Sequence, residues 1–184
     1  VPAADTLEVG ARGGAPHVDG RGLDLSLLLN YNSRIWHKAG SVMTFDIDRD
    51  WIAGWTLGSG KIVMAGDSYM LIDSDGTRHP FEGTLRRNFP SPVSALQSFE
   101  AHTIDGSFMD YYAEGYKPEF DNSGGKNMIV AWAVLPNGMR IEYGAKAKYA
   151  MYPTRITDAH GNFITITYLN NEGPNIQTIT NTLG

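Results

Sequence analysis

The sequence predicts an all-β fold, an antiparallel meander of consecutive hairpins, from three observations. Turn-forming pairs recur between apolar stretches, at Asp75-Gly76, Asp105-Gly106, Asn137-Gly138 and His160-Gly161. Gly takes positive φ freely and Asp or Asn tolerates it, so these pairs suit tight two-residue hairpins. Apolar and polar residues alternate between the turns, as in strands with one buried face. The 21 Gly and 9 Pro among 184 residues leave few windows for three helical turns.

The first expected strand begins after a loose arm or linker over residues 1–20, which is rich in Ala, Gly and Asp. From Leu23 to Tyr31 every second residue is large and apolar, which predicts a strand with one buried face. We expect residues 21–184 to form a single β-rich module. The further strands are predicted at Val42–Trp51, Gly54–Met64, Tyr69–Ile72, Arg78–Phe81, Ser107–Tyr112, Met128–Leu135, Met139–Tyr143, Thr154–Thr157, Asn162–Tyr168 and Ile176–Thr180.

Two longer interruptions are predicted to be irregular loops. One runs over Arg86–Ser98 and contains Pro90 and Pro92, and the other runs over Ala113–Asn127 and contains Gly124-Gly125. Short helices are expected at Val93–His102 and Ala145–Ala150.

An aromatic residue recurs at a fixed distance after three of the turn glycines. Gly76, Gly106 and Gly138 are each followed five residues later by a ring, at Phe81, Tyr111 and Tyr143. Gly161 and Gly184 continue the series at equal spacings of 23 residues, and Tyr168 follows Gly161. One hairpin cannot bury its apolar face alone, so such repeats gain stability by stacking. We therefore interpret Gly76, Gly106, Gly138 and Gly161 as turn residues, and Phe81, Tyr111, Tyr143 and Tyr168 as ladder residues that pack against the next unit.

Five blocks of the sequence resemble the Rhs/YD-repeat family, and in particular the region that opens its repeat array. They are GRGLDLSLLLNYNSR at 20–34, GWTL at 54–57, LIDSDGTRHPF at 71–81, LPNGMRIEY at 135–143 and RITDAHGNFITITY at 155–168. Each block alone is a hairpin signature, but five in family order are specific. The short YD-type repeats lie within residues 154–184.

The resemblance implies a curved or spiral sheet that starts a β-shell. Members include bacterial polymorphic toxins, insecticidal toxin-complex components and teneurins, whose hairpin arrays enclose an effector or build an adhesive body. It implies a secreted or surface-associated bacterial protein whose partners are the downstream repeats of the same polypeptide, with a glycan or cell-surface ligand as a further expectation. The chain lacks the family's C-terminal core with its aspartate-dependent self-cleavage site, so we expect no enzymatic role and no cofactor.

Composition excludes several classes of function. With no Cys, the chain has no disulfide, no thiol nucleophile and no cysteine metal site. Its 15 Lys and Arg against 20 Asp and Glu oppose binding to nucleic acid. No apolar run approaches the roughly 20 residues of a membrane helix, and Val1–Gly14 lacks the order of a signal peptide.

The carboxylates offer two weaker hypotheses. Asp46, Asp48 and Asp50 alternate along a predicted strand, which suggests a solvated edge, a cation site, or paired acids of a glycoside hydrolase. The outer two would be roughly 13 Å apart, too far for one calcium ion. Neighbouring members fall in the range of inverting glycosidases, but one strand cannot place them on opposite sides of a sugar. Asp73 and Asp75 are interpreted as turn residues, since the distal ligands of a calcium loop are missing.

Other templates for chemistry fail. The segment with Gly58, Gly60 and Lys61 matches neither a Walker loop nor a dinucleotide fingerprint, so the glycines are interpreted as a bend between strands. Of the five His residues, only His102 has another metal-type ligand nearby, at Glu100. We interpret His160 as a residue of local turn geometry.

Exposed aromatic rings would support a carbohydrate-binding or adhesion domain instead. Trp36, Trp51 and Trp55 are the candidate glycan contacts, and Trp36, beside His37 and Lys38, is the one most expected to be exposed. Trp132 lies in a stretch that is apolar on both faces and is expected in the interior.

Overall fold

The computed structural model describes the chain in segments, most continuously from residue 68 to the C-terminal region. The described residues are 17–18, 23, 25–26, 28–31, 36–39, 41–45, 55–58, 60–65, 68–87, 97–115, 128–147 and 150–182.

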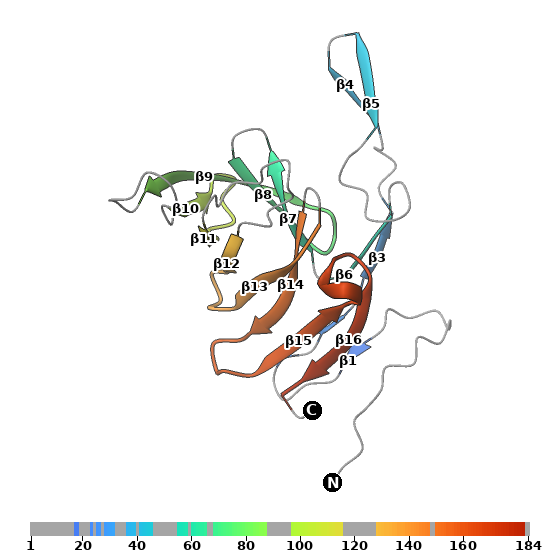
Figure 1. Ribbon diagram of the computed structural model, residues 1–184, viewed down its shortest axis with the longest axis vertical. Coiled ribbons are helices and arrows are strands. Elements are labelled where there is room, and N and C mark those ends of the chain that lie inside the picture. The colour runs from blue at the N-terminus through green and yellow to red at the C-terminus, as the bar shows by residue number, and fades with distance from the viewer. Residues whose placement is uncertain are drawn as a thin grey trace.

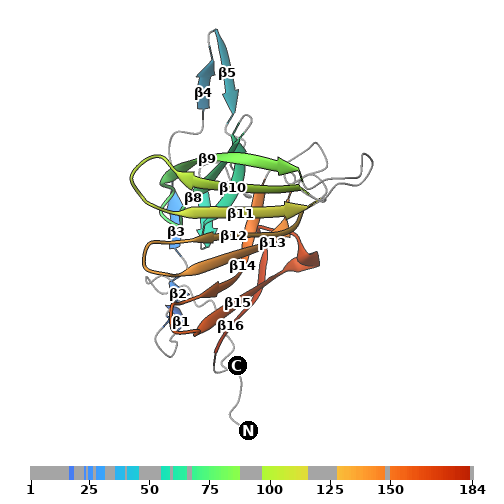
Figure 2. The same cartoon turned by 90° about the vertical axis from the view of Figure 1, so that its left-hand side faces the viewer.

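Eight antiparallel strands close into a barrel (Figure 2). They are β7 (Lys61–Ala65), β8 (Ser68–Ile72), β9 (Arg78–Arg87), β10 (Gln97–Thr103), β11 (Asp110–Gly115), β12 (Met128–Val134), β13 (Arg140–Lys146) and β14 (Ala150–Thr157). Each pairs with the next in the chain, and the ring is closed where β14 pairs with β7 through Ala150 and Val63 and through Met151 and Ile62. The predicted all-β antiparallel meander is confirmed, whereas the closure is a feature that the sequence pattern does not reveal.

Strand β14 pairs with three other strands of the same ten-stranded sheet. One edge pairs with β13 along most of its length, while the other edge pairs first with β7 and then, from Arg155 to Thr157, with β15 (Phe163–Tyr168). A 3-10 turn, η1 (Leu169–Asn171), leads to β16 (Ile176–Asn181), which pairs with β15. The hairpin β15–β16, called the extension below, therefore leaves the barrel wall as a flap (Figure 1).

The N-terminal region contributes three separate two-stranded pairs. These are β1 (His17–Val18) with β2 (Leu25–Ser26), β3 (Leu28–Tyr31) with β6 (Trp55–Gly58), and β4 (Trp36–Ala39) with β5 (Val42–Phe45). Strand β1 falls inside the predicted arm, so at least these two residues of the arm are paired. Figure 1 shows the β4–β5 hairpin standing clear of the barrel.

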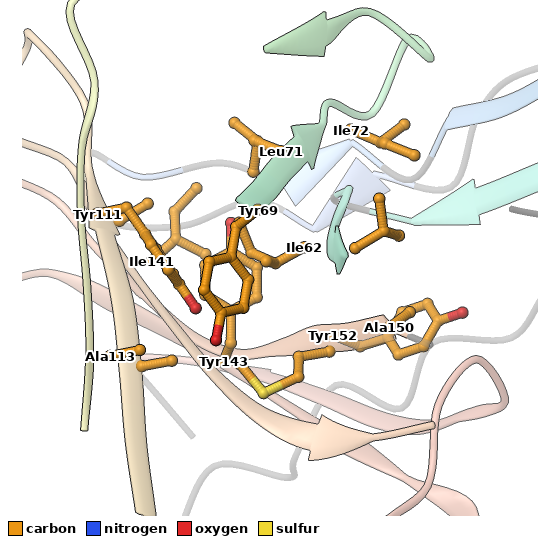
Figure 3. Packing of buried hydrophobic residues seen from close by; sticks show 14 of the residues in the cluster. Ile62, Tyr69, Leu71, Ile72, Tyr111, Ala113, Ile141, Tyr143, Ala150 and Tyr152 are labelled. Atoms are coloured by element: carbon orange, nitrogen blue, oxygen red, sulfur yellow. The ribbon is translucent and has the colours of Figure 1, made fainter. Parts of the chain in front are cut away.

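The barrel interior combines large rings with small wall residues (Figure 3). Tyr69, Tyr111 and Tyr143 are buried in the interior, and each of Tyr69 and Phe99 lies within 6.2 Å of the Tyr111 ring, measured between centroids. Inward positions of the neighbouring strands hold alanines: Ala101, Ala113, Ala131, Ala133 and Ala145. Small side chains on the wall leave the room that the rings fill, which is how an eight-stranded barrel packs solid.

Both predicted helices are wrong. The described part of the first, from Gln97 onward, is β10, in which Phe99 and Ala101 are buried while Glu100 is exposed. Buried and exposed residues alternate along this segment, and it is hydrogen-bonded to a strand on each side. These two features override its helix-forming composition. At the second, Ala145 and Lys146 are the last two residues of β13, and the Ala147 amide donates to the carbonyl of Ala150, the first residue of β14, over 2.8 Å.

Several boundaries also differ from the prediction. Strands β9, β10 and β11 extend into both predicted loops, whose described ends at residues 86–87, 97–98 and 113–115 are regular. The predicted strand Gly54–Met64 is two strands, because the chain breaks between β6 and β7 at Gly58 (φ 123°) and Gly60 (φ 86°). A Cβ at position 60 would meet the Ile72 carbonyl oxygen at 2.5 Å, so this bend requires glycine.

Candidate functional site

Three of the four turns share one hydrogen-bond pattern. The first loop residue donates its amide to the carbonyl four residues on, over 2.8 Å for Asp73 and for Leu135 and 2.9 Å for Asp158. The turn glycine donates back to that first residue's carbonyl over 2.9 to 3.1 Å. Only the glycine has positive φ, between 80° and 86°. The prediction of two-residue turns is therefore wrong: these are longer turns in which glycine alone occupies the left-handed position.

Side chains complete the turns. The residue before glycine accepts the amide two positions on, over 2.8 Å for Asp75 and 3.0 Å for Asn137 and Asp105. In the turn with His160 before the glycine, Asp158 accepts instead, from the amides of His160 and Asn162 over 2.8 and 2.9 Å.

These hydrogen bonds keep the turn carboxylates charged. The amide of Thr77 lowers the pKa of Asp75, and the Asn162 side chain lowers that of Asp158. The hydroxyl and amide of Ser107 lower the pKa of Asp105 to about 2.

The four turns gather at one end of the barrel, because alternate connections of a meander lie at the same end. We call this end the turn rim; it comprises residues 73–77, 103–109, 135–139 and 158–162. Neighbouring turns touch: His79 Nδ1 lies 2.7 Å from Asp105 Oδ2, and a Cβ on Gly138 would lie 3.1 Å from Ala159 Cβ. With its ionised aspartates, the turn rim is an acidic surface.

The predicted ladder residues all face inward. Phe81, Tyr111, Tyr143 and Tyr168 are buried to 4% exposure or less. Phe81 and Tyr111 stack across β10 with centroids 5.0 Å apart, and the Tyr168 hydroxyl donates to the Pro153 carbonyl over 2.8 Å.

Among the described residues, the buried hydroxyls of Tyr111 and Tyr143 have no hydrogen-bond partner. Burial raises the pKa of both phenols, so they stay neutral at physiological pH. The barrel centre is thus an apolar core that also holds the phenol oxygens of Tyr69, Tyr111 and Tyr143.

Trp132 lies on the outer face of the barrel, so the prediction of an interior Trp132 is wrong. The Tyr112 ring stacks on it at 4.2 Å with an interplanar angle of 27°, and the Arg140 guanidinium lies 4.4 Å from its centroid. Tyr112 comes from β11 and Arg140 from β13, on opposite sides of β12. The chain's own side chains therefore cover the faces of this indole that a sugar would need.

The remaining predicted site residues are placed only in part. Trp36 lies on β4 and Trp55 on β6, but their side chains, and Trp51 altogether, fall outside the described residues, as do Asp46, Asp48 and Asp50. Across the described segments, no three His, Asp or Glu side chains are grouped so as to hold a metal ion. The same segments contain no helix with the length and apolarity needed to cross a bilayer.

Within the described part of the chain, β16 is the last strand of its sheet. This strand pairs with β15 on one side and ends the ten-stranded sheet on the other. Its sequence, IQTITN, has no charged residue and no proline, and Gln177, Thr178 and Thr180 are exposed. The strand itself is predictable from alternation, but its terminal place in the sheet is not.

No protein-family model matches the chain, and neither a curated protein nor a solved structure is detectably similar to it. The resemblance to Rhs/YD-repeat proteins therefore depends on the five sequence blocks alone.

Proposed function

We propose that this chain is a non-catalytic structural module, the opening part of an Rhs/YD-type β-shell in a large secreted or surface protein of a bacterium. It acts by presenting β16 to the hairpins that follow in the same polypeptide, and it needs no cofactor. The observation that carries the proposal is the edge of β16 that pairs with no other strand among the described residues.

An open edge is a row of unpaired amide and carbonyl groups, which soluble proteins usually protect with lysine, proline, a bulge or a covering segment. Strand β16 has no lysine and no proline, its register with β15 shifts once, at Gln177, and its residues Ile176, Thr178 and Ile179 favour extended backbone. Such a strand is suited to receive another strand by backbone hydrogen bonding.

The turn repeat supports the identity of that strand. Gly184 follows Gly161 by the same 23 residues that separate Gly161 from Gly138, and Asn181 stands three residues before it, as Asp158 stands before Gly161. A turn of the same type there would reverse the chain and direct the next strand antiparallel to β16.

The experiment compares edge variants of the 184-residue chain by sedimentation velocity over a range of concentrations. The wild type should self-associate through β16, and Thr178→Lys with Thr180→Lys should remain monomeric, since charge on an edge opposes pairing. Thr165→Lys is the matched control: it places the same charge on β15, where both edges are paired with Arg155 and Thr180.

A wild-type chain that stays monomeric at all concentrations would overturn the proposal. The partner is tested by expressing the chain together with the segment that follows Gly184 in its gene. We expect that segment to cover β16 and to abolish the association, and continued association would show that it pairs elsewhere.

A further inference from the structure

The β10–β11 turn is the exception on the turn rim. The Thr103 amide donates to the Met109 carbonyl over 2.9 Å, a closing bond two residues wider than in the other three turns. Phe108 stands two residues after the turn glycine, where the other turns have Arg78, Arg140 and Phe163 as the first or second residue of a strand. Here it has a φ of 53° and is 79% exposed.

The loop that presents Phe108 is firmly held. Buried Thr103 accepts the Met109 amide over 2.9 Å and the Ser107 hydroxyl over 2.8 Å through its Oγ1. Asp105 accepts the Ser107 amide and is joined to His79 on β9. Since Met109 is also buried, both ends of the loop are anchored in the barrel and its tip is preorganised.

A bulky residue with positive φ and an exposed ring is unfavourable twice over. Residues other than Gly, Asn and Asp rarely take this backbone conformation. An exposed phenylalanine ring also leaves its apolar surface in water, so it lacks the free energy that burial would contribute. Ile104 on the same loop is 58% exposed, so the loop presents two apolar side chains. Strained residues with this kind of support cluster at binding sites, and rigid aromatic side chains anchor protein interfaces.

The charges around Phe108 indicate the chemistry of the partner. Asp75 and Asp105 on the rim, and exposed Glu82 and Asp110 on β9 and β11, are acidic, with Arg78 as the cation of the neighbouring turn. Such a field repels polyanions and anionic membranes and attracts basic polypeptides.

We propose that the β10–β11 loop is a docking site for another polypeptide, in which Phe108 packs against an apolar segment flanked by lysine or arginine. The site lies on the turn rim, away from β16, and does not depend on the shell proposed above.

The test is a selection of phage-displayed random 12-residue peptides on the wild-type chain, followed by binding of the selected peptides measured by fluorescence anisotropy. We expect peptides with an apolar centre and flanking Lys or Arg, which bind more weakly as salt rises. Phe108→Gly should weaken their binding at least tenfold. Leu169→Ala is the matched control because it removes another exposed apolar side chain, 52% exposed, remote from the turn rim, and it should leave binding unchanged.

Phe108→Gly also separates a binding role from a structural one. Glycine takes the φ of 53° without strain, so the melting temperature should rise while peptide binding falls. A lower melting temperature would show that the ring stabilises the fold, and selected peptides that bind Phe108→Gly as well as wild type would show that they bind elsewhere. Either result overturns the proposal. So would binding to neutral phosphatidylcholine vesicles that Phe108→Gly abolishes, since it would assign the loop to a membrane.

Discussion

The barrel and the extension are made of the same kind of hairpin, yet they differ in what completes them. Within the barrel, every strand from β7 to β14 has partners on both edges, and its rings are enclosed. In the extension, β16 is paired on one edge among the described residues, and three of its six residues are exposed while none is buried. The comparison shows that closure gives every barrel strand two paired edges, whereas the strands outside the ring end in one that is paired on a single edge within the described part of the chain.

The largest expected effect is on the closing strand. Met151 is fully buried where β14 pairs with β7, and Met151→Ala should lower the free energy of unfolding by about 2 to 5 kcal/mol. Ile179→Ala, at a half-buried position of β16, should lower it by about 1 kcal/mol. Urea unfolding followed by tryptophan fluorescence measures the free energy of unfolding of both variants. Equal losses in the two variants would contradict the difference between barrel and extension.

The turn glycines give the next effect. Gly138→Ala should lower the free energy of unfolding by about 2 kcal/mol, because alanine is strained at a φ of 80° and its Cβ would lie 3.1 Å from Ala159. Gly161→Ala, in the turn that leads into the extension, has the same strain but no atom within 4 Å, so a loss of about 1 kcal/mol is expected. Thermal melts of the two variants would show whether the contact between turns matters.

Removing a tyrosine hydroxyl should have different effects on stability in the extension and in the barrel. Tyr168→Phe in β15 removes the hydrogen bond to Pro153 and should lower the free energy of unfolding by about 1 kcal/mol. Tyr143→Phe removes a buried hydroxyl without a partner, so stability should be unchanged or rise slightly. Urea titrations of the two variants measure these changes. A clear loss of stability in Tyr143→Phe would mean that the Tyr143 hydroxyl has a hydrogen-bond partner inside the barrel.

The smallest effect is on acid stability. The folded pKa of Asp105 is about 2 against an ordinary 3.8, so its contribution is complete above about pH 4 and is lost as the pH falls from about 4 to 2. Unfolding of Asp105→Asn over this range should be less dependent on pH than that of the wild type. Asp158, in the turn that leads into the extension, has its pKa lowered in the same direction. An unchanged pH profile in both Asn variants would show that these turn bonds do not stabilise the fold.

Local features of the fold were accessible from the sequence, and non-local ones were not. The turn glycines and the alternation in β13 depend on neighbouring residues, and both are visible in the chain. Closure depends on Ile62 and Met151, which are far apart in sequence, and no local pattern marks their pairing.

Side-chain direction was the least predictable. Trp132 follows an apolar stretch, and in a strand a shift of one residue moves a side chain from the inside to the outside. Phe108 gave no signal either, because its exposure follows from a turn whose closing bond spans two residues more than those of the other three turns on the rim. For Trp36, Trp51 and Trp55, glycan contact stays a prediction.

The pairing of one edge of β14 with both β7 and β15 has a consequence for synthesis of the chain. A chain that emerges from the ribosome can form the hairpins from β7 to β13 one after another, but it cannot seal the ring until Met151 has left the exit tunnel. Until then, one edge of β7 and one edge of β13 are unpaired. Strand β14 can pair with β7 before β15 has been synthesised, and β15 therefore cannot yet compete for the same edge of β14. The order of translation thus favours the barrel first and the flap second.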